Sequence, residues 1–294
     1  MTESFLTQYI APLVLAFIMF GMGLSLTKQD FQQLWRAPLP IIVGLFGQLM
    51  LLPLLAYFLA LVFELPSNLA IGIMILAACP GGTSSNIISQ LARANLALSV
   101  SLTAISSLIC VLTTPLIIQF AVSQFGQQEQ QSFSLVSTTI GLIFITLIPV
   151  IIGITLRHYF AEKAISSEPF FRHLASAFLV LMILAIVIQE KATLASSFSA
   201  VFTSALTLNL VAILLGIGLG LIFRFSARDC VTLGIEVGVQ NSAMAILIAI
   251  TFLQRADYAV APGVYGVTMY IGAFLLVFLA KKFRSPPIIV RQVP

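Results

Sequence analysis

Residues 234–242 read GIEVGVQNS, and this stretch decides the fold. Within it, Glu236 is the one acidic side chain of the sequence that lies well inside an apolar segment, without a charged neighbour on either side in sequence. An ionisable group at membrane depth is expensive unless it has a partner, so it marks a candidate functional site. Two glycines and a polar pair interrupt the same segment. The stretch therefore predicts a broken membrane helix that holds a cation.

The composition of the 294-residue chain, 60% hydrophobic and 8% charged, excludes a soluble domain with a solvated surface. A helix needs about 20 residues to cross the hydrocarbon layer of a bilayer. Nine apolar segments are long enough, so we predict an all-α polytopic membrane protein with nine transmembrane helices in a single domain over residues 1–294. The predicted spans are 5–27, 38–63, 67–93, 95–122, 133–157, 171–190, 200–224, 229–254 and 262–281.

Basic residues are distributed unevenly over the loops between these spans. Of the fourteen Lys and Arg residues, only Lys191 and Arg255 fall on one side of the predicted membrane. Positive loops stay on the cytoplasmic side, which places the N-terminus outside and the C-terminus in the cytoplasm. The net charge of +4 then reflects topology and gives no reason to expect nucleic acid. The other twelve are Lys28, Arg36, Arg93, Arg157, Lys163, Arg172, Arg224, Arg228, Lys281, Lys282, Arg284 and Arg291.

The third and eighth predicted spans are interrupted in their middles. The third breaks at residues 80–82, Pro-Gly-Gly, where Thr83 or Ser84 can cap the second half. The eighth breaks around 238–241, where Asn241 or Ser242 can do the same. Broken helices at corresponding places in two halves are typical of the binding site of a secondary transporter. Either break alone is equally well explained as a simple kink, since glycine and proline are common in membrane helices.

The order of the two breaks fits an inverted repeat. The third and eighth spans are five crossings apart, so they cross the membrane in opposite senses. Two discontinuous helices arranged in this way can cross each other near the midplane of the membrane. Freed carbonyl groups would then face a cation, and the N-termini of the half-helices would face an anion.

Other polar residues lie in register with the breaks. Ser99 and Thr103 share one face of the fourth span, and Gln48 is the one strongly polar side chain in the middle of the second. Hydroxyl side chains in membrane helices often bond only to their own backbone, which is the alternative for Ser99 and Thr103. Hydroxyl, amide, carboxylate and carbonyl oxygens together, however, suit a hard monovalent cation.

Enzymatic activity is the least favoured class. No nucleophile with an adjacent base and no metal-ligand spacing of Cys or His occurs in any span or loop, so we expect no enzyme and no cofactor. A channel or receptor would not need two broken helices in opposite senses. The short loops leave no room for another domain, and no obligate protein partner is evident.

Four stretches of the chain resemble signatures of the bile acid:sodium symporter family, including its animal apical and hepatic transporters. They occur in the expected order across nearly the whole sequence. The stretches are FGMGL at 20–24, CPGGTSSN at 79–86, LARANLALSV at 91–100 and EVGVQNS at 236–242.

This resemblance implies two inverted repeats that form a core domain, about 38–122 and 200–281, and a panel domain, about 5–27, 133–157 and 171–190. It also implies two sodium ions as coupling ions and a bacterial inner membrane location. One sodium site would use Ser85, Asn86, Ser99, Thr103 and Glu236. The second would use Gln48, Glu236, the backbone carbonyls of Val237 and Val239, and Gln240.

The function expected from the resemblance is sodium-coupled uptake of an organic anion by alternating access, with the helix ends at Thr83 and Asn241 facing its negative group. We expect no basic side chain in the cavity, which favours a small monocarboxylate such as pantoate over a bile-acid-like anion. A proton-coupled carrier, or an exporter in which Glu236 titrates, remains the alternative. The expected partners are sodium, the anion and the lipid bilayer.

Overall fold

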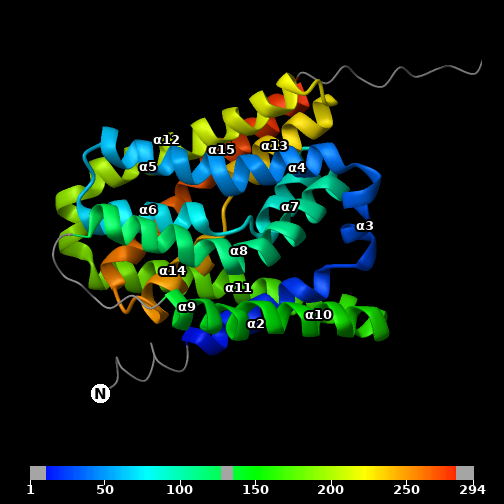
Figure 1. The fold of residues 1–294 in the computed structure, drawn as a ribbon, viewed down its shortest axis with the longest axis horizontal. Coiled ribbons are helices and arrows are strands. Elements are labelled where there is room, and N and C mark those ends of the chain that lie inside the picture. Colours follow the sequence, from blue (N-terminus) through cyan, green and yellow to red (C-terminus); the bar gives the residue numbers. More distant parts are fainter. Residues whose placement is uncertain (1–10, 127–134, 283–294) are drawn as a thin grey trace, which may run out of the picture.

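The computed structural model describes residues 11–126 and 135–282, and every regular element within them is helical (Figure 1). Parts of the first and fifth predicted spans, together with Arg284 and Arg291, lie outside these residues. The helices of the first described segment are α2 (Ala11–Ser25), α3 (Lys28–Arg36), α4 (Pro38–Phe46), η2 (Gly47–Leu51), α5 (Leu52–Val62), α6 (Ser67–Ala78), α7 (Thr83–Leu91) and α8 (Leu96–Phe125).

The second described segment completes the bundle. It contains three helices of more than 20 residues and six shorter ones. They are α9 (Leu135–Leu142), η3 (Ile143–Leu147), α10 (Ile148–Tyr159), α11 (Ala161–Gln189), α12 (Lys191–Ile222), α13 (Ala227–Gly238), α14 (Ser242–Thr251), η4 (Ala256–Ala259) and α15 (Val260–Lys282).

Six of the helices are long and apolar enough to cross a membrane, and the described residues reach seven when the bent pair α2 and α3 counts as one span. The predicted third and eighth spans are each divided, into α6 and α7 and into α13 and α14. The count of nine crossings stays a prediction. The six long spans are Pro38–Val62, Leu96–Phe125, Val136–Tyr159, Ala161–Gln189, Lys191–Ile222 and Ala256–Lys282.

Prolines shape two of the long spans. Pro53 and Pro149 each stand at the second position of an α-helix that follows a π-helical turn, η2 or η3. A proline within a helix removes one hydrogen bond and crowds the carbonyl four residues earlier, which a wider turn relieves. Gln48 lies in η2, so the wide turn of this span falls at its one strongly polar side chain.

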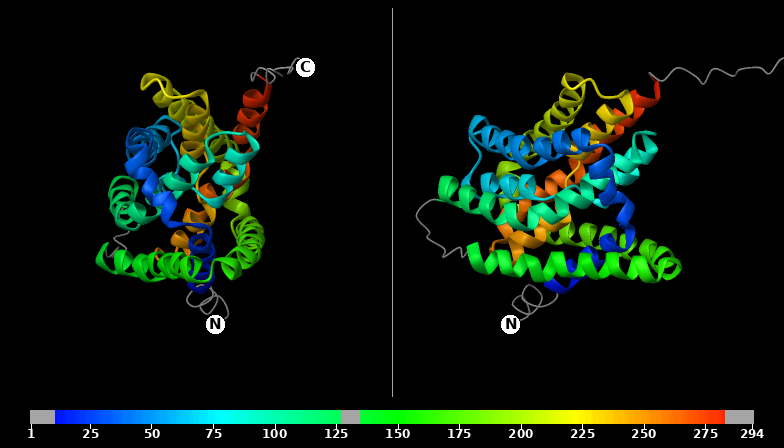
Figure 2. Two further views of the ribbon diagram at one scale, coloured as in Figure 1. Left: turned by 90° about the vertical axis from the view of Figure 1, so that its right-hand side faces the viewer. Right: turned by 45° about the vertical axis from the view of Figure 1, so that its right-hand side comes forward.

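Helices α2, α10 and α11 pack against one another and lie together at one side of the molecule (Figure 2). Gly23 of α2 meets Gly153 of α10 backbone to backbone, with no room for a side chain at either position. On the opposite side, Gly216 of α12 meets Gly234 of α13 in the same way. Small residues let membrane helices approach closely, which explains both contacts.

The broken helices lie in the interior of the part of the molecule outside α2, α10 and α11. Residues Leu69 to Ala78 of α6 and Ser242 to Ala249 of α14 are buried on every face. In contrast, α5 and α11 expose large apolar side chains such as Leu54, Phe58 and Leu181. Apolar side chains on the outside of a bundle are expected where the solvent is lipid. The two breaks therefore lie in the interior of the molecule, away from the lipid-facing surface.

Candidate functional site

The two breaks cross and are joined by backbone hydrogen bonds. Gly81 and Gln240 form an isolated antiparallel bridge, and the Asn241 N–H donates to the Pro80 carbonyl over 3.0 Å. A helix that stops inside a membrane leaves backbone groups without partners, and each costs free energy unless it is satisfied. Pairing one break with the other satisfies some of these groups and shows that the two breaks meet.

The caps of the two second half-helices differ from each other. Asn241 caps α14, since its side-chain oxygen accepts a hydrogen bond from the Met244 N–H over 3.0 Å. The predicted cap of α7 is wrong, because its N-cap residue is Gly82 and makes no side-chain hydrogen bond. Thr83 begins α7 and leaves its side chain available to the cavity beside it.

Glu236 stands in the last turn of α13, with 1% of its surface exposed. The Ser99 hydroxyl donates to Oε1 over 2.5 Å, and the Thr103 hydroxyl donates to Oε2 over 2.9 Å. No ion pair among the described residues includes Glu236. A buried carboxylate held only by neutral hydroxyl groups is an arrangement that a bound cation would stabilise.

All five residues predicted for the first cation site come together here. The Ser99 hydroxyl lies 2.9 Å from Asn86 Oδ1 as well as beside Glu236, and the Ser85 and Thr103 hydroxyls are 3.4 Å apart. Helix α7 supplies Ser85 and Asn86, while the shared face of α8 supplies Ser99 and Thr103. The cluster gathers one carboxylate, one amide and three hydroxyl groups around a single point.

The absence of a side chain at Gly81 keeps this cluster open. A Cβ atom at Gly81 would lie 3.1 Å from Glu236 Oε2, 3.3 Å from Gln48 Nε2 and 3.7 Å from Ser85 Oγ. Gly81 therefore stands between the first group of oxygens and Gln48. Its φ is not positive, so space rather than backbone conformation is what requires glycine.

The residues predicted for the second cation site lie on the other side of Gly81. Gln48 Nε2 donates to Gln240 Oε1 over 3.5 Å, and Gln240 Nε2 donates to the carbonyls of Glu236 and Val237 over 3.2 and 3.0 Å. Gln48 Oε1 is buried and accepts no hydrogen bond from the described residues. Val239 is fully buried within the break itself. An unpartnered buried oxygen is a candidate ligand for a cation.

Two side chains that the sequence did not single out fix the second break. The Asn209 amide of α12 and the Tyr265 hydroxyl of α15 both donate to the Gly238 carbonyl, each over 2.7 Å. Both residues are fully buried. Asn209 is an amide in the middle of an apolar segment, as Gln48 is, and the same reasoning would have found it. Tyr265 gives no such signal, because tyrosine is ordinary in apolar segments.

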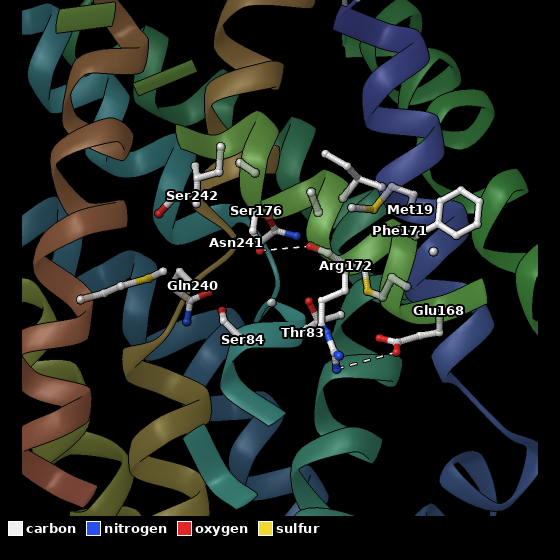
Figure 3. A pocket seen from close by; sticks show the side chains of 18 of the residues that line it. Met19, Thr83, Ser84, Glu168, Phe171, Arg172, Ser176, Gln240, Asn241 and Ser242 are labelled. Atoms are coloured by element: carbon white, nitrogen blue, oxygen red, sulfur yellow. Dashed lines mark hydrogen bonds and ion pairs between the residues drawn. The ribbon is translucent and has the colours of Figure 1, made fainter. Parts of the chain in front are cut away.

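A cavity lies between the breaks and the helices α2 and α11 (Figure 3). Thr83 and Asn241, the predicted substrate-binding residues, both line it, as do Ser84 and Ser242. Two charged residues of α11, Glu168 and Arg172, face them (Figure 3).

The expectation that no basic side chain faces the cavity is therefore wrong. From the sequence, Arg172 counted among the cytoplasmic basic residues, at the very start of a span predicted over 171–190. In the structure, α11 begins ten residues before that span and continues through Pro169. The longer helix carries Arg172 alongside the cavity. A proline can lie inside a helix without ending it, as Pro169 does in α11.

The described chain is thus a helical membrane protein in which two broken helices cross at a buried, oxygen-lined site next to a cavity. Comparison with known proteins narrows this class further. Residues 12–197 match the Sodium Bile acid symporter family, and the chain belongs to that family.

Three relatives show how far the similarity extends. The chain is 30% identical to the "Uncharacterized sodium-dependent transporter YocS" of Bacillus subtilis, over 96% of this chain and 86% of that protein. It is 29% identical to the "Probable sodium/metabolite cotransporter BASS2, chloroplastic" of rice, over 92% and 64%. It is 28% identical to the human "Sodium-dependent organic anion transporter", over 94% and 73%. All three are named as transporters, which confirms that the protein is a transporter and not an enzyme.

Proposed function

We propose that the protein takes up an organic anion together with sodium by alternating access. The observation that carries this proposal is Glu236, a buried carboxylate whose oxygens accept hydrogen bonds from the Ser99 and Thr103 hydroxyl groups and which forms no ion pair with the residues that the structure describes. A proton relay needs the carboxyl group alone, whereas hydroxyl, amide and carbonyl oxygens gathered around it suit a sodium ion. The family and the names of the relatives also favour sodium coupling.

Two sodium ions would share Glu236 in this proposal. The first would replace the hydrogen bonds that link Ser85, Asn86, Ser99 and Thr103 to one another and to the carboxylate. The second would bind Gln48 Oε1, Glu236, Gln240 and the carbonyls of Val237 and Val239. Rotation of the Gln240 amide would exchange the Nε2 donor that now faces Glu236 and Val237 for an oxygen.

During alternating access, one group of helices would move relative to another. We propose nine crossings arranged as inverted repeats, with α4 to α8 and α12 to α15 as the core and α2, α9 to α11 as the panel. The packing of α2 against α10 and α11 supports this division. Binding of sodium would fix the crossing of the breaks, and movement of core against panel would then expose the cavity on the other side of the membrane.

The substrate's negative group would meet the helix ends at Thr83 and Asn241, because the N-terminus of a helix carries partial positive charge. Both residues line the cavity beside the breaks. The substrate would be a small monocarboxylate such as pantoate or a bile-acid-like anion. The human relative named as an organic anion transporter supports the broader class.

The orientation of the protein in the membrane follows from the uneven distribution of Lys and Arg residues over the loops. Helix α3, the end of α10 and the end of α7 lie at one end of the molecule (Figure 1). The basic residues in or directly after these segments would mark the cytoplasmic side; they are Lys28, Arg36, Arg93 and Arg157. We propose a bacterial inner membrane, with the N-terminus outside and the C-terminus in the cytoplasm.

Uptake of labelled pantoate and taurocholate by proteoliposomes tests the function. An inward sodium gradient should drive uptake of one of these anions, and an equal potassium gradient should not. Two sodium ions with one monovalent anion carry net positive charge, so an inside-negative potential should accelerate uptake, since each charge is worth about 2.3 kcal/mol per 100 mV. Equal uptake in sodium and potassium would overturn the proposal.

A further inference from the structure

The cavity contains one ion pair that the proposed sodium sites do not use. Arg172 and Glu168 lie one turn apart on α11, with the guanidinium Nη1 3.7 Å from Glu168 Oε2. Figure 3 shows the Arg172 side chain reaching from α11 toward Thr83, with its guanidinium facing Glu168. Arg172 is the only basic residue among the described residues that line this cavity.

The pair lies where two cavities meet. Thr83, Glu168 and Arg172 line the cavity that contains Asn241, and the same three residues line a second cavity that extends toward Ser25 and Arg157. An anion moving between the breaks and the second cavity therefore passes the guanidinium. The side chains of Arg172 and Glu168 are 39% and 20% exposed, so both are accessible from these cavities.

The geometry of the pair leaves the guanidinium able to bind another anion. A charge-assisted hydrogen bond between Arg and a carboxylate is about 2.7–2.9 Å long and is frequently bidentate. At 3.7 Å, the contact with Glu168 is neither short nor bidentate. Guanidinium has five N–H donors in a planar fork, so donors remain for a carboxylate that enters from the cavity.

We propose that Arg172 binds the anionic group of the transported substrate and that Glu168 competes with the substrate for it. This rests on the proposed function and names a residue outside the crossing as the one that selects for negative charge. The helix ends at Thr83 and Asn241 offer only partial charges, whereas Arg172 offers a full one on the opposite wall. Competition from Glu168 keeps the anion from being held too tightly to leave.

Binding measurements on the purified full-length protein in detergent test this assignment. Titration calorimetry with pantoate and with taurocholate, each in sodium, should show that Arg172→Gln weakens binding of the anion that the wild type binds by roughly 10- to 100-fold. The anion affinity of Arg172→Lys should lie between those of the wild type and Arg172→Gln, because lysine keeps the positive charge but lacks the planar guanidinium group. Glu168→Gln should bind the anion several-fold more tightly than the wild type.

Two controls separate a role in anion binding from other effects. Lys163→Gln removes the same charge from an exposed position on α11 that lines neither cavity, and it should bind the anion as the wild type does. Stabilisation of each variant by sodium alone, followed by thermal unfolding without any anion, should match the wild type.

The outcomes distinguish this inference from the function on which it rests. If Arg172→Gln binds the anion as tightly as the wild type, the inference fails and sodium-coupled uptake stands. If Arg172→Gln and Lys163→Gln weaken binding equally, general electrostatics explains the effect and the inference also fails. If the wild type binds neither anion in sodium, the proposed substrate class fails, and the inference with it.

Discussion

The break between α6 and α7 and the break between α13 and α14 cross each other, yet different features fix their backbones. In the first, Pro80, Gly81 and Gly82 interrupt the helix, α7 begins without a side-chain cap, and the Thr114 hydroxyl of α8 donates to the Ala78 carbonyl over 2.6 Å. In the second, Asn209 and Tyr265 hold the Gly238 carbonyl, and Asn241 caps the following helix. Side chains from neighbouring helices thus support both breaks, but the first also needs glycine where an added side chain would meet the oxygen cluster, and the second needs the Asn241 cap.

This difference has a physical consequence for the site. The first break must leave room for oxygens and ions beside Glu236, so anything added there intrudes on the cluster. The second break carries Glu236 itself, so anything that loosens it moves the carboxylate. We expect substitutions that add side-chain atoms to disturb the first break, and substitutions that remove a hydrogen-bonding side chain to disturb the second.

The largest effect is expected from Gly81→Ala. Its new methyl group would lie 3.1 Å from Glu236 Oε2 and 3.3 Å from Gln48 Nε2. Overpacking of this kind costs about 1–3 kcal/mol, so sodium affinity should fall by roughly 10- to 100-fold. Gly82→Ala is the matched control, because its methyl group meets only the flexible Ser84 hydroxyl within 3.4 Å. Sodium titrations followed by thermal unfolding should separate the two variants, and equal behaviour would contradict the account of the first break.

Gln48→Met tests whether the unpartnered oxygen beside both breaks exists for an ion. Methionine has a similar volume and removes Gln48 Oε1, which is buried and accepts no hydrogen bond from the described residues. Without sodium, the variant should unfold at about the same temperature as the wild type, because removal of the unsatisfied Gln48 Oε1 offsets loss of the long hydrogen bond from Gln48 Nε2 to Gln240 Oε1. In sodium, the stabilisation should be weaker, with affinity reduced about tenfold. Undiminished stabilisation by sodium would remove Gln48 from the proposed second site.

Tyr265→Phe and Asn209→Leu test the hydrogen bonds that hold the second break. Each removes one hydrogen bond to the Gly238 carbonyl and should lower the free energy of unfolding by about 1 kcal/mol. The double variant leaves that carbonyl without either donor, so its loss should exceed the sum of the single losses. Thermal unfolding of all four proteins in detergent gives the coupling. Strict additivity would show that the two donors do not act on one carbonyl.

The smallest expected difference concerns the two helix caps. Asn241→Ala removes the side-chain oxygen that accepts from Met244 and should destabilise the protein by about 1 kcal/mol. Thr83→Ala removes no capping bond and should cost only a few tenths of that. Thermal unfolding without substrate compares them directly. A larger loss in Thr83→Ala would mean that the first break depends on its side chains after all.

Much of the site could be predicted from the sequence because its residues are rare in their surroundings. A carboxylate, an amide and paired hydroxyl groups stand out in apolar segments, and Pro-Gly-Gly interrupts a helix wherever it occurs. Spacing placed Ser99 and Thr103 on one face of α8, and both contact Glu236. These features depend on residue type and local periodicity, which the sequence contains.

The remaining features depend on packing. Arg172 lines the cavity because its face of α11 turns toward α2 and the breaks, and the start of α11 before Pro169 could not be read from local preference. The partner of the Gly238 carbonyl depends on which faces of α12 and α15 turn inward. Asn209 was detectable as a polar residue in an apolar segment, but Tyr265 was not.

The most direct test of the shared role of Glu236 is sodium binding in the absence of any organic anion. Titration calorimetry would compare the wild type with Glu236→Gln and with Glu64→Gln, a matched change at an exposed glutamate in the loop between α5 and α6. The account predicts two sodium ions per chain for the wild type and for Glu64→Gln, and loss of both from Glu236→Gln. Sodium binding by Glu236→Gln with the stoichiometry and affinity of the wild type would contradict it.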